Sequence, residues 1–140
     1  MLNEPISEVQ SHKHLGIHFS NDGSWHSHIE SIKCKTWKRI NIMRKLKFVL
    51  DRKSLETIYF SFIRPVLEYA DVIWDNCSKY EKEEIDKIQH EAARIGTGAT
   101  KLVSISDLNT ETGWEPLDCR RANHKLILFY KMVHSPKPCC

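Results

Sequence analysis

Basic side chains concentrate in one stretch of this sequence, between residues 33 and 53. Nine lysines and arginines stand there against one acid, Asp51, which gives the stretch a charge of +8, while the other residues total −5 within an overall +3. Clustered cations are typical of a surface that binds phosphates, because each phosphate contact releases counterions. The segment therefore predicts contact with a nucleic-acid backbone, and a solvated helix face is the alternative. The residues assigned to this contact are Lys33, Lys38, Arg39, Arg44, Lys45, Lys47, Arg52 and Lys53.

Histidines form a second chemically active group near the start of the chain. His12, His14, His18, His26 and His28 fall within seventeen residues. On a strand the first three would share one face, whereas His26 and His28 on a helix would turn to different faces. No cysteine or acid completes this set at a usual zinc spacing, which favours a polar hairpin face. We therefore expect no metal or other cofactor in this chain.

The cysteines and tryptophans favour structural roles. Five cysteines at wide spacings, with no C-x-x-C pair, indicate free thiols in a reducing compartment. Cys34 and Cys119 lie in helical patterns and are expected to be small buried side chains. Trp37 is the one tryptophan inside the basic segment and is a candidate for base stacking, whereas Trp25, Trp74 and Trp114 are expected in the core.

A short β element is expected before the basic segment. Leu15, Ile17 and Phe19 alternate with smaller or polar residues, and the turn residues 20–23 follow. We predict a hairpin that ends at this turn. Ser24 is then the expected N-cap of a helix.

The remaining elements are predicted to be helices. Apolar residues from Trp25 to Met43 recur at steps of three and four, so this helix can bury one side and present cations on another. Asp51 is expected to cap a central helix that reaches Ile73, with a kink or break at Pro65. A further helix is expected to begin at a capping box at residues 78–81 and to end at Gly96. A short helix should follow, with its cap at Ser104 or Ser106 and its stop at Gly113. The last helix is expected to begin at Pro116 and to bury a stripe of Cys119, Ala122, Leu126, Phe129 and Val133.

The predicted fold is mainly α, a small β-hairpin followed by a bundle of four to five helices. We expect a β element over residues 1–23, a helical domain over 24–134 and a tail over 135–140. No apolar run approaches the length of a membrane span, and the first residues carry no secretory pattern. We expect an intracellular protein that does not contact a membrane.

An ordered series of motifs resembles one protein family. The string Lys13-His14-Leu15-Gly16-Ile17 resembles the K-Y-L-G-V motif of reverse transcriptases from non-LTR retrotransposons of the jockey-like group, with His14 in place of tyrosine. Further matching pieces follow in the family's order up to about His134: Trp25 to Ile29, Arg52-Lys53-Ser54-Leu55, Tyr59, residues 63–70, Trp74-Asp75, Ile88-Gln89, Ala92-Ala93-Arg94, residues 113–117, Arg120-Arg121 and Phe129-Tyr130-Lys131.

This resemblance implies the grip and thumb of an RNA-directed DNA polymerase. Lys13, His14, Leu15 and Gly16 would correspond to the primer grip, and the helices after them to the thumb that follows the duplex. The implied partners are an RNA or DNA primer–template duplex and the palm domain of the parent polymerase. That palm carries the acidic residues for two Mg²⁺ ions, and we expect it to lie outside this sequence.

Two alternatives remain beside this interpretation. Tyr69-Ala70-Asp71-Val72 looks like a degraded Y-A-D-D motif, but its second acid is valine and it lies in a helical pattern that matches the thumb. We therefore expect no catalytic residue. The chain is alternatively a helical protein–protein interaction module descended from the same element.

Overall fold

The computed structural model describes residues 5–135 and begins with a two-stranded hairpin. Strands β1 (Ser11–His14) and β2 (Ile17–Ser20) pair antiparallel and are joined by Leu15 and Gly16. Both linking residues have positive φ, +49° and +80°, which the tight two-residue turns of hairpins require. The hairpin is therefore confirmed, but Leu15 lies in its turn and not on a strand.

Helix α1 (His26–Leu46) carries the first part of the core and most of the basic segment. Its buried face includes Ile29, Ile32, Ile40 and Met43, as the three–four spacing predicts. The expected cap at Ser24 is wrong. Ser24 instead donates its backbone N–H to Asp22 Oδ1 at 2.9 Å and so closes the preceding turn.

The expected central helix is broken into four pieces. They are α2 (Arg52–Ile58), the π-helical turn η1 (Tyr59–Ile63), α3 (Arg64–Glu68) and α4 (Asp71–Trp74). Asp51 caps α2 through Ser54, as predicted. Pro65 has no N–H to donate, and the wide π turn stands directly before it, closed by the Arg64 N–H on the Tyr59 carbonyl. The chain leaves α3 at Tyr69, whose ψ is 120°, and Ala70 then adopts the left-handed conformation with φ +53° before α4 begins.

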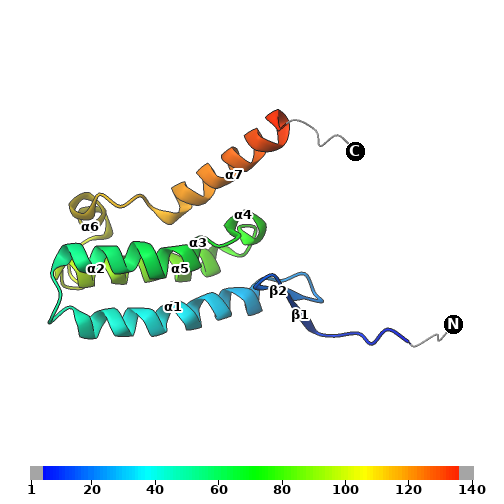
Figure 1. Ribbon diagram of the computed structural model, residues 1–140, viewed down its shortest axis with the longest axis horizontal. Coiled ribbons are helices and arrows are strands. Elements are labelled where there is room, and N and C mark those ends of the chain that lie inside the picture. Colours follow the sequence, from blue (N-terminus) through cyan, green and yellow to red (C-terminus); the bar gives the residue numbers. More distant parts are fainter. Residues whose placement is uncertain (1–4, 136–140) are drawn as a thin grey trace.

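Helix α5 (Lys79–Thr97) runs parallel to α1 and packs along it (Figure 1). Its capping box of Ser78 and Glu81 is present as predicted. The helix ends at Gly98, which adopts the left-handed conformation with φ +73°, whereas Gly96 remains inside the helix and the predicted end there is wrong.

Helix α6 (Ile105–Thr112) begins at the Ser104 cap and ends at Gly113, both as expected. The loop after it carries Trp114, whose ring stacks on Tyr59 with 4.3 Å between centroids. The Tyr59 hydroxyl donates to Gln89 Oε1 at 2.6 Å. Trp114 and Gln89 thus connect η1, α5 and the loop after α6 within one core, where the fully buried Trp74 also lies.

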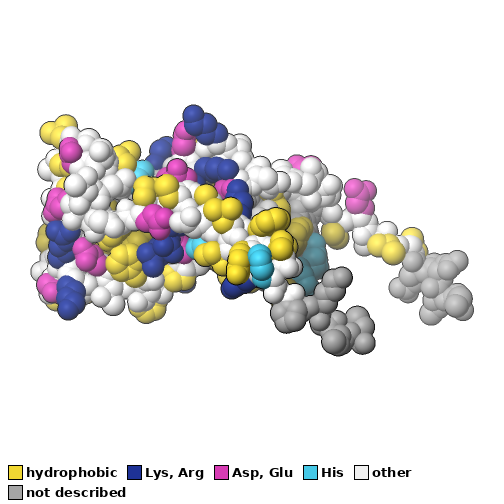
Figure 2. Space-filling model, turned by 90° about the horizontal axis from the view of Figure 1, so that it is seen from above, with side chains coloured by type: hydrophobic (Ala, Val, Ile, Leu, Met, Phe, Trp, Pro, Cys, Tyr) yellow, Lys and Arg dark blue, Asp and Glu magenta, His cyan; other side chains and the backbone are white. Residues whose placement is uncertain are grey.

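The last helix, α7 (Leu117–His134), packs with a face other than the predicted one. Its inward positions are Leu117, Arg121 and His124, whereas the expected buried stripe is exposed, with Leu126 at 66%, Phe129 at 67% and Val133 at 59%. Ion pairs decide this phase, because Arg121 and His124 meet acids of α4 and α5. Figure 1 shows the second half of α7 projecting from the bundle, and Figure 2, which views the molecule from that side, shows hydrophobic side chains at its surface.

No helix within residues 5–135 has the length and apolar composition needed to cross a bilayer. The predicted mainly helical fold with a leading hairpin is confirmed. The predicted tail of residues 135–140 lies, except for Ser135, outside the described residues.

Candidate nucleic-acid interface

The grip-like residues form the tip of the hairpin. Lys13 and His14 end β1 and are exposed, while Leu15 and Gly16 make the turn. Tyr69, which follows α3, fastens this tip: its hydroxyl donates to the Leu15 carbonyl at 2.6 Å. A Cβ on Gly16 would lie 3.5 Å from the Tyr69 ring, which is ordinary contact, so the positive φ is the stronger reason for glycine here.

Tyr69→Phe is expected to loosen the hairpin tip without unfolding the chain. The lost hydrogen bond is worth about 1 kcal/mol, and water can replace it at the exposed Leu15 carbonyl. Amide hydrogen exchange at His14 and Ile17 should become faster. Tyr80→Phe is the matched control, because Tyr80 is an exposed tyrosine with no hydrogen bond from its hydroxyl among residues 5–135. Equal exchange in both variants would contradict a fastening role for Tyr69.

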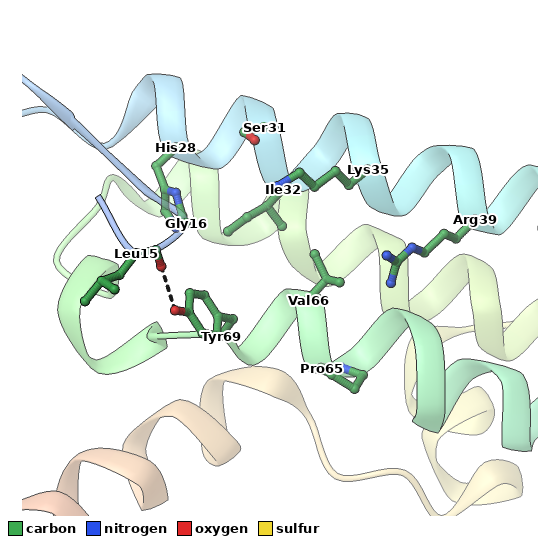
Figure 3. A pocket seen from close by; sticks show the side chains of 10 residues that line it. All are labelled: Leu15, Gly16, His28, Ser31, Ile32, Lys35, Arg39, Pro65, Val66 and Tyr69. Atoms are coloured by element: carbon green, nitrogen blue, oxygen red, sulfur yellow. Dashed lines mark hydrogen bonds between the residues drawn. The ribbon is translucent and has the colours of Figure 1, made fainter. Parts of the chain in front are cut away.

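A solvent-open cleft of about 390 Å³ lies between the hairpin tip, α1 and α3 (Figure 3). Pro65, Val66 and Tyr69 form its α3 side, and Lys35 and Arg39 extend over it from α1. The Arg39 guanidinium also donates to the Phe62 carbonyl beside Pro65. The cleft therefore combines an apolar wall with two cations, which suits a ligand with an anionic backbone and apolar faces.

His28 closes the hairpin end of this cleft and is only 3% exposed. Its Nδ1 accepts the His18 backbone N–H at 3.4 Å, and its ring lies among those of His18, Trp25 and Trp74. Burial, and then the positive charges of His18 and Lys35, lower the pKa of His28 to about 4. His28 is therefore neutral at physiological pH and leaves the positive charge of the cleft to Lys35 and Arg39.

Three of the predicted phosphate-binding residues are engaged with acids of the same chain. Lys33 pairs with Glu30 and Glu84, and Arg44 pairs with Glu91 at 2.8 Å, so both side chains turn toward α5 or along α1. Arg52 pairs with Glu56 and Glu111. These three cations stabilise contacts between helices, so their charge is partly neutralised at the surface.

The other predicted cations have no carboxylate within 4.0 Å anywhere in residues 5–135. They are Lys38, Arg39, Lys45, Lys47 and Lys53, and Lys35 shares this property although the sequence did not single it out. Lys35, Lys38 and Lys45 follow each other at steps of three and seven residues and so lie on one face of α1. We call these three residues the lysine ridge.

Apolar side chains are exposed beside the lysine ridge. Ile42 lies on the same face of α1 and is 57% exposed, and Phe62 of η1 is 60% exposed across a shallow groove. Phe48 is 83% exposed, with the Lys47 ammonium 5.1 Å from its ring centroid. Cations interleaved with exposed rings are typical of surfaces that bind single or double strands.

Sequence reasoning missed the α3 side of the cleft. Pro65, Val66 and Tyr69 were assigned to a buried helix, and the cleft exists because the chain leaves α3 just after Glu68. Pro65 predicts a kink, but the chain departs from the helix at Tyr69 and Ala70, where no proline or glycine marks a break. Nor does Tyr69 indicate a partner in the hairpin 54 residues away.

The histidine cluster does not assemble as predicted. The hairpin register pairs His12 with Phe19, Lys13 with His18 and His14 with Ile17, which puts His12 and His14 on one face and His18 on the other. The expectation of a shared face is wrong because the Leu15–Gly16 turn reverses the chain between them. Within residues 5–135 no three histidine, cysteine or acidic side chains are arranged to hold a metal ion.

The prediction of free thiols is confirmed for the three described cysteines, but the expected burial of Cys34 and Cys119 is wrong. The expectation that Trp25, Trp74 and Trp114 belong to the core is confirmed. Cys34 and Cys119 are exposed, because α1 and α7 turn these positions away from their neighbours. Trp74 and Trp114 are buried and Trp25 packs against the core. Trp37 also packs against the core, and the Arg44 guanidinium lies 5.7 Å from its ring centroid. These contacts leave less of the Trp37 ring accessible than base stacking needs.

Asp71 of the Y-A-D-V string is a structural residue. It is 3% exposed and pairs with His124 Nδ1 at 2.6 Å, which joins α4 to α7. The string does not continue a helix as expected, since Tyr69 and Ala70 separate α3 from α4.

Comparisons with protein-family models, curated proteins and solved structures find no match to this chain. The function is therefore inferred from the geometry of the cleft and the lysine ridge.

Proposed function

We propose that this chain binds the sugar–phosphate backbone of a nucleic-acid duplex through the lysine ridge and the adjoining cleft. In this proposal it acts as the grip and thumb of a retrotransposon reverse transcriptase. The observation that carries the proposal is the face of α1 on which Lys35, Lys38 and Lys45 stand without acidic partners among the described residues.

The ridge has the dimensions and chemistry of a backbone contact. From Lys35 to Lys45 the rise along α1 is about 15 Å, which spans several phosphates of a strand. Lysines that bind phosphates position a duplex without reading its sequence. A polymerase needs this kind of contact because it must accept every template.

The cleft adds a second element to the proposal. It joins the hairpin tip to α3 and α1, and these segments carry three of the motifs that resemble the reverse transcriptases. We propose that the hairpin tip, with Lys13, His14, Leu15 and Gly16, contacts the end of a primer strand. The phosphoryl transfer would belong to a palm domain that binds Mg²⁺, so none of these residues is given a catalytic role.

Reversing the lysine ridge in the variant K35E/K38E/K45E is expected to weaken duplex binding by roughly 10- to 100-fold at low salt. The slope of log affinity against log salt should fall by about three, one for each phosphate contact that is lost. Fluorescence anisotropy with a labelled RNA–DNA duplex, measured over a salt series, gives both quantities.

The variant K79E/K87E/K131E is the charge-matched control. These exposed lysines lie on α5 and α7, outside the ridge, and their reversal changes the net charge by the same amount. It should keep most of the affinity. If both triple variants weaken binding equally, only overall charge matters and the ridge is not the site.

The exposed half of α7 favours a second candidate, a protein–protein interaction module. Seven large apolar side chains between Leu126 and Val133 are more than a third exposed there, and monomeric proteins rarely expose large contiguous apolar patches. Size exclusion with light scattering, at low and high salt, separates the candidates. Salt-insensitive self-association without duplex binding would favour the interaction module.

A further inference from the structure

A second cavity lies at the opposite end of α1 from the hairpin. It is open to solvent, has a volume of about 390 Å³ and is formed by the end of α1, the last turns of α5 and the loop after α5. The residues that the following argument uses are Arg44, Lys47, Glu91, Arg94 and Lys101. They come from three segments of the chain, so no local run in the sequence reveals this site.

The cavity is strongly cationic once its internal ion pair is considered. Glu91 is its one acidic lining residue, and Glu91 Oε1 already accepts both Arg44 Nε at 3.2 Å and Arg44 Nη2 at 2.8 Å. Lys47, Arg94 and Lys101 have no carboxylate within 4.0 Å in the described part of the chain. Three positive charges therefore converge on one hollow without compensation.

Arg94 carries an unsatisfied donor at this site. Its Nε is buried and has no hydrogen-bond partner within residues 5–135. A buried donor without an acceptor is costly, and such groups in native proteins usually serve a ligand or an ordered water. Arg94 lines the cavity and is only half-buried, so an acceptor that enters the cavity would relieve this cost if the guanidinium turns Nε toward it.

The helix dipole of α5 does not account for these cations. The carbonyl end of a helix has a partial negative charge of about half a unit, which one cation in the last turn offsets. Arg94 already occupies the last turn of α5. Lys47 and Lys101 come from outside this helix, so its dipole does not account for their position at the cavity.

We propose that this cavity binds a phosphate group, held by Lys47, Arg94 and Lys101. A tetrahedral oxyanion offers acceptors to several donors at once, and arginine and lysine bind it with charge-assisted hydrogen bonds. The source of the phosphate is either a strand of the duplex, which would extend the lysine ridge across the end of the bundle, or a free polyphosphate. The site does not depend on the function proposed above.

Pyrophosphate titration of the full chain, followed by amide NMR, tests the site directly. We expect the amides of Gly98, Thr100 and Lys101 to shift in a saturable way. R94Q/K101Q should weaken pyrophosphate binding by about tenfold, since each charge-assisted contact contributes strongly. The single variant K101Q should also weaken pyrophosphate binding. Because Lys101 lies in an exposed loop, this loss cannot be attributed to a folding defect caused by the change at Arg94.

Lys131→Gln is the matched control, because Lys131 is an exposed cation of α7 that does not line the cavity and is not among the residues predicted to contact nucleic acid. Its pyrophosphate affinity should equal that of the original chain. A duplex that shifts the same amides and competes with pyrophosphate identifies a nucleic-acid phosphate, whereas shifts with pyrophosphate alone identify a free polyphosphate. The proposal is overturned if these amides do not respond to pyrophosphate, or if K101Q binds pyrophosphate as tightly as K131Q and the original chain do.

Discussion

Asp75→Ala is expected to lower the free energy of unfolding by about 3 kcal/mol, which corresponds to a fall in melting temperature of roughly 10 °C. Asp75 is 7% exposed and faces three cations. Arg121 Nε lies 3.1 Å from Asp75 Oδ1, Lys82 Nζ lies 3.3 Å from it, and Lys125 pairs with the other oxygen. Arg121 itself is 3% exposed, so removal of the carboxylate leaves a buried charge with less compensation.

The direction of the Asp75 pKa agrees with this role. Burial raises the pKa of Asp75, but hydrogen bonds from Lys125 and Lys82 outweigh burial and hold it below the ordinary value. A carboxyl whose folded pKa is depressed stabilises the fold above its unfolded pKa, and this stabilisation is lost as the pH falls through the folded pKa. The contribution of Asp75 is therefore complete at neutral pH and disappears in acid below about pH 4.

Arg121→Met is the informative comparison for Asp75→Ala. In that variant Asp75 keeps Lys82 and Lys125, and methionine fills part of the space of the arginine stem. Urea unfolding should therefore give a smaller loss for Arg121→Met than for Asp75→Ala. If Arg121→Met is the more damaging change, then packing of α7 and not the charge of Asp75 dominates this site.

Acidification from pH 7 to pH 5 is expected to cost about 2 kcal/mol of stability through His28 alone. Its pKa is about 4 in the folded chain against an ordinary value of 6.5. His28 is therefore protonated below about pH 6.5 in the unfolded chain, but only below about pH 4 in the folded chain. Between these two pKa values stability falls by about 1.36 kcal/mol for each unit of pH, and the loss is complete once the pH lies below both.

His28→Gln should flatten this dependence, measured by urea unfolding at several pH values between 5 and 7. Some slope of the same sign remains, because burial also lowers the pKa of His90. His26→Gln is the control, since His26 is exposed and its nearest acid is Glu81 at 3.6 Å. An unchanged slope in His28→Gln would assign the acid sensitivity to other groups.

The sequence predicted the starts and ends of helices well where a residue close in sequence to the helix end caps it. The Ser78–Glu81 capping box, the Asp51 cap and the Gly113 stop are all in place. Each of them depends on residues within four positions, so the sequence contains the whole interaction. The prediction failed at Ser24 because the N-cap position of α1 is Trp25, so the Ser24 hydroxyl lies one residue too early to accept a hydrogen bond there.

The phase of α7 was not predictable from apolar spacing. The helix has apolar residues on most faces, and burial of Arg121 and His124 depends on Asp75, Asp86 and Asp71, which lie 35 to 53 residues earlier. Charge pairing over such distances leaves no periodic signal. The prediction from apolar spacing alone therefore assigned to the core a face of α7 that is exposed in the structure.

The candidate interface was predicted in part. The basic segment indicated the helix face, but it did not separate the lysine ridge from Lys33 and Arg44, whose acidic partners stand on another helix. Arg94 and Lys101 were missed entirely, since they join the second cavity only when α5 packs parallel to α1. A count of charges along the sequence finds only cations that are close in sequence, whereas a phosphate would contact cations that the fold brings close together in space.

The contact between Tyr69 and the hairpin tip has a consequence for how this sequence can evolve. Leu15 and Gly16 hold a turn with positive φ, and the Tyr69 hydroxyl bonds to the carbonyl inside it. The acceptor is a backbone carbonyl, so any residue that holds the turn at position 15 preserves this contact, although 54 residues separate the two partners. Position 69, in contrast, must carry a side chain with a donor, so the contact constrains the sequence at one of its two ends only.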